Sequence, residues 1–497
     1  MKKRKSMDAH FTSIQEIRTD KSTFDLIFNS LRIPFPTTKT YETVKKNLVD
    51  FLETIKDDVR VVVESDYADP VYRDSYYHHY SIKLRPYAKD CVRLSFFEPK
   101  YVTLNDFISR DTEEIQKTYL GFLVLRPLNK CIGRNAIDTR AKKFPLGDIE
   151  ICKTTIKATC LGHKLSVKAF PHSSQDSEYM SCAENSIWTM MEYFGNKYTV
   201  YDPILPSQIV QALADYKYER LIPTTGLSYS HISMLLKKRG FETKVYDWQN
   251  AKFQEIFACY IESGLPLIVC IQGSTFGHAV VCVGRKKYDY TQFDHFEEVT
   301  IQGKTLHLSY WNKHIDTFVV NDDNFPSYHM MEFANSVKEY PTAGDAKIKS
   351  FIVPMHEEIF IPAELAIGLS NIYVLNYLKL DYSCLRTFLT TGRSYKEYVI
   401  NNKDLSSENK QQLIQLDLPK FVWITEFVEI NQKTTDKISG MLAIDATGNT
   451  RDVIIEKSLI FMIHSGKGVF YDNHKGKFIN TISNFPTLFE RFKGNLK

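Results

Sequence analysis

The sequence lacks the closely spaced cysteine pairs that bind zinc or staple a small scaffold. Nine cysteines are scattered over the 497 residues, and none of them forms a C-x-x-C motif. This spacing excludes a zinc ribbon and a compact disulfide framework. We therefore expect reduced thiols and a cytoplasmic location, and we expect no bound metal and no cofactor.

Long apolar runs with the features of a membrane or export segment are missing as well. The basic start, MKKRK, is followed by no apolar stretch of the kind that a secretory signal needs. The segment 365–378 has no Asp, Glu, Lys or Arg, but it is too short for a membrane span and contains Ser370 and Asn371. These absences predict a soluble protein without a membrane partner.

A large charge of one sign is also absent. The chain has 63 Lys and Arg residues against 59 Asp and Glu residues, which gives a net charge of +4. Because this small excess is spread over the whole chain, we expect no nucleic-acid partner. The tyrosine-rich segment 67–87 could stack on bases or on a peptide. Tyrosines in short edge strands more often pack, however, and packing is the interpretation that we favour.

What the chain does have is the composition of a folded protein, with 43% hydrophobic and 25% charged residues. At about 150 residues per domain, its length corresponds to roughly three domains. Changes of pattern predict an N-terminal mixed α/β domain at 1–165, a middle domain at 166–358 and a C-terminal helix plus antiparallel β domain at 359–497. The fold class that we expect is α+β.

Hydrophobic periodicity predicts the main elements of each domain. In the N-terminal domain it predicts a helix within 39–60, a strand that ends at Tyr67 and a strand at 119–128. In the middle domain it predicts helices at 182–194, 207–216, 229–238 and 253–263, and strands at 241–248, 266–273, 278–285 and 317–323. In the C-terminal domain it predicts a helix from Pro362, a polar helix near 394–416, and strands at 421–428, 440–447, 453–464 and 468–472.

One cysteine stands at the start of a predicted helix. After Cys182, the apolar residues Ile187, Met190, Met191 and Phe194 recur at helical spacing. Unpaired N–H groups and the positive end of the helix dipole favour a thiolate at such a position. Most cysteines merely pack, but a polar turn precedes this one, and Cys182 is therefore the best candidate for a nucleophile.

A thiol nucleophile needs a base, and His278 is the strongest candidate among the 14 histidines. It follows Gly277 and begins the predicted strand 278–285. From there the imidazole could take the proton of Cys182, stabilise the thiolate and then protonate a leaving amine. A lone histidine beside a strand usually packs or lies at the surface. The order of a helix-capping cysteine, this strand and a strand with an acidic end favours the functional interpretation.

The strand with the acidic end is 317–323, which closes with Asn-Asp-Asp. One of these side chains could accept a hydrogen bond from the imidazole and fix its tautomer. Neighbouring strand residues point to opposite faces, so Asn321 and Asp322 cannot both serve, and we favour Asp322. The alternative is an acidic turn that merely closes the strand. Gln175, which lies before Cys182, could donate its amide to an oxyanion beside the backbone N–H of the cysteine.

These features occur in one order along the chain. They are Gln175, Cys182, Phe194-Gly195, Arg239-Gly240, Gly264-Leu-Pro266, Gly277-His278-Ala279-Val280 and Val320-Asn321-Asp322. With these motifs the segment 168–330 resembles the papain-fold cysteine peptidases, most closely the bacterial branch that includes the leader-peptide peptidases of bacteriocin exporters. The resemblance implies a papain-like core, in which a helix bundle packs on an antiparallel sheet, and thiol acyl-transfer chemistry on an amide.

The segment also departs from the family pattern. Ala183 and Asn185 stand where a Gly and a Pro commonly follow the cysteine, and Gln175 lies one residue further from the cysteine than is typical. Asp323 replaces a proline. The insertion 285–316 separates the histidine strand from the aspartate strand, and its polar and aromatic composition predicts a hairpin over the cleft. These departures bear on the substrate and leave the three central residues in place.

We therefore predict a cysteine peptidase that cleaves a peptide or isopeptide bond in a protein or peptide substrate. Cys182 attacks the carbonyl, His278 acts as base and then as acid, Asp322 orients His278, and Gln175 completes the oxyanion hole. The flanking domains would select the substrate. Two alternatives stay open: a thiol acyl transferase or deamidase that uses the same site, and a non-catalytic papain-fold module that binds a peptide or scaffolds a partner.

Overall fold

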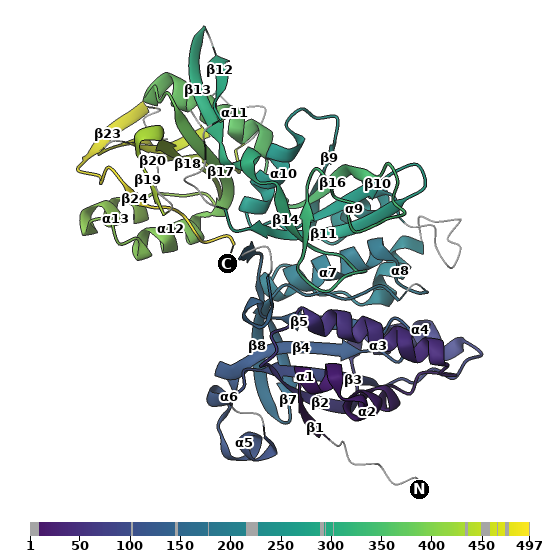
Figure 1. The fold of residues 1–497 in the computed structure, drawn as a ribbon. Helices are drawn as coiled ribbons and strands as arrows, with labels where there is room; N and C mark the ends of the chain where they lie inside the picture. Colours follow the sequence, from purple (N-terminus) through teal and green to yellow (C-terminus); the bar gives the residue numbers. More distant parts are fainter. Residues whose placement is uncertain are drawn as a thin grey trace.

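The computed structural model describes most of the chain (Figure 1). The described residues are 9–100, 103–144, 148–176, 178–214, 227–288, 293, 295–301, 303–432, 436–448, 458–464, 466–472 and 477–496. They form an α+β fold, as the sequence predicts, with three large and mainly antiparallel sheets, and one hairpin of the third sheet lies in the chain between strands of the second. Within these residues, no helix combines the length and the apolar character needed to cross a membrane.

The N-terminal sheet has its strands in the order β1-β2-β3-β4-β5. The strands are β1 (Ala9–Ser13), β2 (Arg60–Tyr67), β3 (Cys91–Phe97), β4 (Tyr119–Leu125) and β5 (Ile132–Ile137). The helices are α1 (Ile14–Thr19), α2 (Lys21–Leu31), α3 (Thr38–Glu53), α4 (Pro70–His78), η1 (Tyr80–Ile82), α5 (Leu104–Ser109), α6 (Thr112–Thr118) and η2 (Thr139–Ala141), and a hairpin follows with β7 (Thr154–Cys160) and β8 (His163–Ala169). Side chains alternate along a strand. Val61 and Val63 therefore pack with α1, α2 and α3, whereas Val62 packs with α4, α6 and the hairpin.

The middle sheet has the order β15-β14-β11-β10-β16-β9, and β6 pairs with β11. The strands are β6 (Ile149–Ile151), β9 (Phe241–Asp247), β10 (Leu267–Gln272), β11 (Gly277–Lys286), β14 (Thr317–Asn321), β15 (His329–Glu332) and β16 (Lys347–His356), and the helices are α7 (Cys182–Lys197), α8 (Pro206–Ala214), α9 (Tyr229–Lys238) and α10 (Phe253–Glu262). These bounds confirm the predicted elements, although residues 215–216 of the second predicted helix lie outside the described residues. In Figure 1, α7 and α8 lie between the N-terminal sheet and this one.

The edge strand β9 shows which helices cover each face of the middle sheet. The ring of Phe241 packs 4.8 Å from that of Phe194 in α7. Thr243 is two residues after Phe241 and points to the same face, where its hydroxyl hydrogen-bonds the Ser233 hydroxyl in α9. On the opposite face, the hydroxyls of Tyr246 and Tyr260 in α10 are 2.9 Å apart. The helix that begins with Cys182 and the helix α10 therefore lie on opposite faces of the sheet.

The C-terminal sheet has the order β12-β13-β17-β18-β20-β21-β22-β23. The strands are β12 (Glu297–Ile301), β13 (Lys304–Tyr310), β17 (Ser383–Thr391), β18 (Phe421–Glu429), β20 (Gly440–Asp445), β21 (Leu459–His464), β22 (Lys467–Asp472) and β23 (Lys477–Ser483), and β19 (Lys437–Ile438) pairs separately with β24 (Phe489–Glu490). The helices are η3 (Trp311–His314), α11 (Ala363–Tyr373), which continues as a π-helical turn η4 (Val374–Leu378), α12 (Gly392–Asn401), α13 (Ser407–Ile414) and η5 (Ile430–Gln432). Residues 453–457 of one predicted strand lie outside the described residues.

Two predictions about the C-terminal part were wrong. The polar helix near 394–416 is two helices, because the side chain of Ser406 accepts a hydrogen bond from the Asn409 N–H and starts α13 anew. The insertion 285–316 does contain a hairpin, but β13 pairs in parallel with β17. The hairpin thus extends the C-terminal sheet, at the top of Figure 1, instead of covering the cleft.

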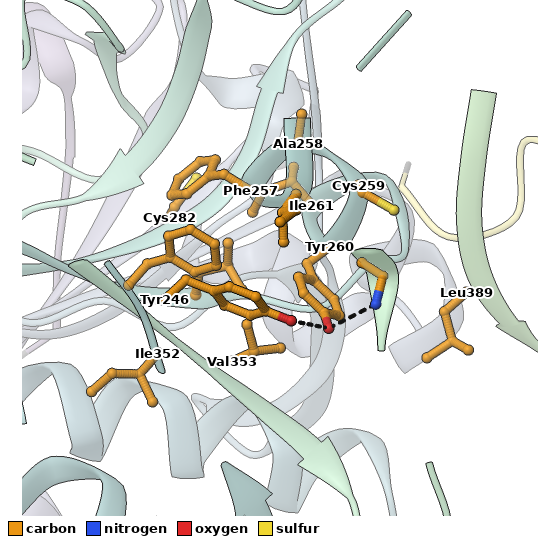
Figure 2. Close-up of a cluster of buried hydrophobic side chains, with 14 of the residues drawn as sticks. Tyr246, Phe257, Ala258, Cys259, Tyr260, Ile261, Cys282, Ile352, Val353 and Leu389 are labelled. Carbon is orange, nitrogen blue, oxygen red and sulfur yellow. Dashed lines mark hydrogen bonds between the residues drawn. The ribbon is translucent and has the colours of Figure 1, made fainter. Parts of the chain in front are cut away.

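Helix α10 is buried between the middle and C-terminal sheets (Figure 2). Its Tyr260 hydroxyl accepts the N–H of Ala363, which begins α11, at 3.1 Å. On the C-terminal side, the Cys259 thiol donates to the Thr387 carbonyl in β17 at 3.2 Å. Gly264 ends the helix with φ +69°, and a Cβ there would lie 2.8 Å from the Asn495 carbonyl oxygen. Glycine is required at this position both by the backbone angle and by the approach of the C-terminal segment.

A buried lysine lies where the N-terminal sheet meets the middle one. The ammonium of Lys142 donates to the Thr54 hydroxyl at 2.6 Å. It also lies 5.0 Å from the centre of the Phe51 ring and 6.0 Å from that of Tyr328. The Tyr328 hydroxyl donates to the Ile137 carbonyl at 2.8 Å, which joins the two sheets. Burial lowers the pKa of Lys142 from the ordinary 10.5 to about 7.

The effect of Lys142→Met on the free energy of unfolding is expected to depend on pH. Between pH 7 and 10.5 the unfolded chain binds more protons at Lys142 than the folded chain does, so this group makes stability rise with pH, by about 1.4 kcal/mol per unit. The variant lacks that slope, and its stability relative to the natural protein should fall as pH rises. Urea unfolding of both proteins at pH 7, 8.5 and 10 measures it. A difference that is constant with pH would contradict the prediction.

Candidate active site

Cys182 is the first residue of α7 and is half-buried. All nine cysteines are free thiols, and the other eight are buried. The hydroxyl of Ser181, just before the helix, donates to the Glu184 carboxylate and does not cap the helix N–H groups. The positive end of the helix therefore remains available to the sulfur. Cys182 is the cysteine that a reagent can reach most easily from solvent.

The first turns of α7 are attached to the strand that carries His278. The Ser186 hydroxyl donates to the carbonyl of Ala279 in β11 at 3.2 Å. Ser186 lies about one turn beyond Cys182, and Ala279 directly follows His278, so this bond places the start of the helix beside the start of the strand. The side chains of Cys182 and His278 interact, and this interaction raises the pKa of the imidazole. The structure thus brings together the predicted nucleophile and the predicted base.

Asp322 is the other partner of His278. It directly follows β14, which runs antiparallel beside β11, and its Oδ1 lies 2.9 Å from the imidazole Nε2. Asn321 points elsewhere, because its amide donates to the Pro171 carbonyl at 3.0 Å. The choice of Asp322 over Asn321, made from strand alternation, agrees with this geometry. Since Asp322 occupies Nε2, Nδ1 is the nitrogen left for Cys182.

The charges around His278 favour its protonated form. Burial lowers the pKa of His278, but the hydrogen bonds to Asp322 and Cys182 and the negative charges of Asp322 and Asp323 outweigh burial and raise this pKa to about 11. Burial also raises the pKa of Asp322, yet the hydrogen bond and the charge of His278 leave it below the ordinary 3.8. At neutral pH the arrangement is therefore an imidazolium bonded to a carboxylate.

Tyr340 covers this hydrogen bond. Its hydroxyl donates to Asp322 Oδ2, and its ring centre lies 5.5 Å from that of the His278 imidazole. The ring also packs 5.3 Å from Phe276, the residue before the strand that carries His278. The side chains of His278 and Asp322 are only 5% and 3% exposed. Exclusion of water strengthens the attraction between them.

A second histidine, His172, contacts the backbone of Asp322. His172 is buried, and its Nε2 donates to the Asp322 carbonyl at 3.0 Å while its Nδ1 accepts from the Asn135 amide at 3.0 Å. Burial lowers the pKa of His172 to about 4, so the ring is neutral at neutral pH, as these two bonds require. Asn135 belongs to β5. The backbone of the proposed acid is therefore anchored in the N-terminal sheet.

The loop before Cys182 is shaped by one buried carboxylate. Asp176 Oδ1 accepts hydrogen bonds of 2.8 to 2.9 Å from the backbone N–H groups of Glu178, Tyr179 and Met180. The N-terminal part of the chain holds the same loop: Arg126 donates to the Ser174 carbonyl at 2.9 Å, and His79 stacks on Tyr179 at 5.0 Å. The tyrosine-rich segment 67–87 thus packs in part against this loop, as its favoured interpretation predicts.

Gln175 lies in this loop, but its amide points to the other side of the site. Its Nε2 donates to the Asn324 side-chain oxygen at 2.9 Å. The Asn324 amide nitrogen in turn lies 3.4 Å from His278 Nε2. Among the described residues, the partner of the Gln175 amide is therefore Asn324 and not a group at Cys182. The role of Gln175 as an oxyanion donor stays a prediction.

A second carboxyl group faces the same imidazole nitrogen. Asp323 Oδ1 lies 3.7 Å from His278 Nε2. Burial raises the pKa of Asp323 to about 7, and the charge of His278 opposes this rise while that of Asp322 adds to it. The ligand atoms of His278, Asp322 and Asp323 all lie within 4.8 Å of one another, close enough to hold a metal ion. The sequence predicted no metal here.

Three residues of the site were not predicted from the sequence: His172, Asn324 and Tyr340. Tyr340 lies in the connection between β15 and β16, and no pattern marks it there. His172 adjoins Pro171 in a segment without periodicity. Asn324 closes the turn Asp322-Asp323-Asn324, for which the alternative interpretation is a turn that merely ends the strand. The only sequence feature that marks Asn324 is its place after two aspartates, where Asn favours a turn.

A comparison of the chain with models of known protein families and with curated proteins finds no match. The functional argument therefore depends on the geometry of the site.

Proposed function

We propose that the protein is a papain-like cysteine peptidase that cleaves an amide bond in a protein or peptide substrate. One observation carries the proposal. The half-buried Cys182 begins a helix and interacts with His278, whose Nε2 lies 2.9 Å from the buried Asp322. A thiol at a helix start, paired with an imidazole that a carboxylate orients, is the arrangement of an activated nucleophile.

In the first step the Cys182 thiolate attacks the carbonyl carbon and forms a carbon–sulfur bond. The oxygen becomes negative, and the backbone N–H groups at the start of α7, which no side chain caps, are donors that could bind it. His278 then donates its Nδ1 proton to the leaving amine, and the carbon–nitrogen bond breaks. The products of this step are a free amine and a thioester on Cys182.

In the second step a water molecule attacks the thioester. His278, now neutral, takes a proton from this water, and the carbon–sulfur bond breaks. The acid product leaves, and the thiolate and the imidazolium are restored. Asp322 keeps the proton of Nε2 in place throughout, so that Nδ1 is the nitrogen that gives and takes protons.

The arrangement of the middle sheet supports the papain-like part of the proposal. The helix with the nucleophile packs on the antiparallel sheet that carries the base and the acid, and α9 lies on the same face. We propose that residues 168–330 are the core of this peptidase. The N-terminal sheet would then contact the site at two places. Asn135 in β5 bonds His172, which bonds the Asp322 carbonyl, and Arg126, which follows β4, bonds the Ser174 carbonyl in the loop before Cys182.

The proposal predicts new protein N-termini that depend on Cys182. Lysate of the producing cells is incubated with the natural protein, with Cys182→Ala or with Cys160→Ala, and protein N-termini are compared by mass spectrometry. Cys160 is a buried thiol in the β7–β8 hairpin and serves as the matched control. We expect the natural protein and the control to produce a shared set of N-termini that the Cys182→Ala protein does not produce.

Identical sets from all three proteins would overturn the peptidase proposal. In that case the same samples identify the alternatives. Conversion of Gln to Glu or new amide cross-links that depend on Cys182 would show a deamidase or an acyl transferase. The absence of any product that depends on Cys182 would favour a module that binds without catalysis.

A further inference from the structure

We propose that His278, Asp322 and Asp323 form a binding site for a divalent transition-metal ion of the zinc class, and that the ion switches off the site of Cys182. Binding itself needs only these three side chains. The inhibitory effect rests on the proposed function. The site was not predicted from the sequence, and it uses Asp323 at the position where the family that the sequence resembles has a proline.

The first support is the spacing of the ligand atoms. Nε2 of His278 lies 2.9 Å from Asp322 Oδ1 and 3.7 Å from Asp323 Oδ1. All three ligand atoms lie within 4.8 Å of one another. Ligands that bind one zinc ion at about 2.0 to 2.2 Å are necessarily about 3 to 4 Å apart, so small adjustments suffice. Once the ion has displaced the Nε2 proton to solvent, the neutral imidazole and the two carboxylates also compensate the charge of a divalent ion.

The second support is a buried oxygen without a partner. The side chain of Asp323 is 2% exposed, and its Oδ2 has no hydrogen-bond partner among the described residues. Buried carboxylate oxygens are almost always hydrogen-bonded, because an unpartnered oxygen in an apolar setting loses the bonds that it makes with water. A metal ion bound by both oxygens of Asp323 would give Oδ2 the partner that the described residues do not provide.

The third support is the side chain that now lies against these atoms. The amide nitrogen of Asn324 is 3.4 Å from His278 Nε2, 3.5 Å from Asp322 Oδ1 and 3.2 Å from Asp323 Oδ1. The partly positive hydrogens of the Asn324 amide thus lie next to all three ligand atoms, in the place where a cation would bind. Asn324 is exposed, so its side chain can swing aside without unfolding the core.

The ligand set indicates the class of ion. Imidazole with carboxylate oxygens suits Zn²⁺ and its neighbours Co²⁺ and Ni²⁺, whereas Mg²⁺ and Ca²⁺ prefer oxygen ligands alone. With three protein ligands, a fourth position remains for water. We therefore commit to Zn²⁺, with Co²⁺ as its spectroscopic substitute.

The effect on catalysis follows from the proton count of the imidazole. A metal ion on Nε2 occupies the lone pair there and displaces the proton that Asp322 holds. The proton of the neutral ring must then remain on Nδ1. To protonate a leaving amine, this ring would have to become an imidazolate, and to accept a proton from water it has no free lone pair. The metal-bound His278 is therefore unable to act as acid or as base at neutral pH.

The test measures binding in a protein that lacks the thiol. In the Cys182→Ala protein, Zn²⁺ titrated by calorimetry is expected to bind one site, and Co²⁺ is expected to give a visible absorption band that Zn²⁺ abolishes. Adding Asp323→Asn should weaken binding at least about tenfold. Glu255→Gln is the matched control, because Glu255 on α10 is another buried carboxyl group whose Oε2 has no hydrogen bond among the described residues, although Lys313 lies 3.8 Å from it. This control should not change the affinity.

Two results would overturn the metal site. One is loss of binding in Cys182→Ala, which would mean that the thiol is the ligand. The other is equal affinity with and without Asp323→Asn. If Asp323→Asn does not fold, thermal unfolding decides: Zn²⁺ must raise the unfolding temperature of Cys182→Ala, as any ligand of the folded state does, and failure to raise it refutes the proposal.

The inhibitory effect has a separate readout. The natural protein is labelled at Cys182 by a peptide electrophile, once with a chelator and once with Zn²⁺. The labelling rate with Zn²⁺ is divided by the rate with the chelator. Strong labelling in chelator supports the thiol site whether or not metal binds. Labelling that Zn²⁺ does not slow, in a protein shown to bind Zn²⁺, would refute the inhibition alone.

Discussion

Replacing His278 with alanine is expected to slow the alkylation of Cys182 by iodoacetamide at pH 6 by about a hundredfold. At that pH less than about one in a hundred ordinary thiols, with a pKa near 8.5, is ionised. In the proposed mechanism the imidazolium of His278, which interacts with Cys182 and is held by Asp322, supplies the positive charge next to the reacting sulfur. Its removal leaves the helix dipole as the remaining stabilising field.

To measure the rate, alkylation is stopped at set times, and the modified peptide that contains Cys182 is quantified by mass spectrometry. His356→Ala is the control, because His356 is another strand-end histidine, in β16, away from the site. It should alkylate at the natural rate. An unchanged rate in His278→Ala would mean that the imidazole does not activate the thiol, and the proposed mechanism would fail with it.

The largest expected effect on stability is that of Glu262→Gln. Glu262, at the end of α10, pairs with Arg285 in β11 and, at 2.8 Å, with Arg386 in β17. All three side chains are less than 10% exposed. Removing the carboxylate takes away the anion that two buried guanidinium groups share, so we expect the free energy of unfolding to fall by about 3 to 5 kcal/mol. Arg285 keeps Glu150 and Arg386 keeps Glu426 as a partner, each at 2.9 Å.

Urea unfolding at pH 7 measures this loss. Asp436→Asn is the control, since Asp436 and Lys493 form an ion pair in which both side chains are more than half exposed, and its loss should cost no more than about 1 kcal/mol. Burial raises the pKa of Glu262, but the charges of Arg285 and Arg386 lower it to about 2. Its stabilisation is therefore present above pH 4.5 and lost as pH falls toward 2. A loss below 1 kcal/mol at pH 7 would contradict the prediction.

This ion network also explains how the C-terminal sheet relates to the site. Arg285 is the last residue but one of β11, and His278 is the second, so the same strand carries the proposed base at one end and the bridge to the C-terminal sheet at the other. The sequence could not indicate this, because Glu262, Arg285 and Arg386 are distant from one another in the chain.

The sequence predicted well what depends on local patterns. The apolar spacing after Cys182 corresponds to α7, Gly240 and Gly264 end α9 and α10 at positive φ, and the runs before and after His278 are β10 and β11. Helical and strand periods report which side of an element is buried. They place a residue on its own element, and on this basis Cys182, His278 and Asp322 are candidates whose catalytic roles stay predictions.

The sequence failed where the outcome depends on packing between distant segments. The hairpin within 285–316 has a strand pattern, but the pattern does not state its partner, and β17 at 383–391 was not predicted at all. Tyr340 reaches Asp322 only because the connection after β15 turns back over the sheet. The side-chain direction of Gln175 is likewise set by Asn324, which lies far along the chain.

The most direct test of the account is the competition of the nine cysteines for a limiting thiol reagent. The folded protein is treated at pH 6 with less than one equivalent of iodoacetamide, and the modified peptides are quantified by mass spectrometry. We expect nearly all label on Cys182, because it is half-buried and paired with His278 while the other eight thiols are buried. Label spread over several cysteines, or a Cys182 that reacts no faster than a free thiol, would contradict the claim that these residues form an activated nucleophile.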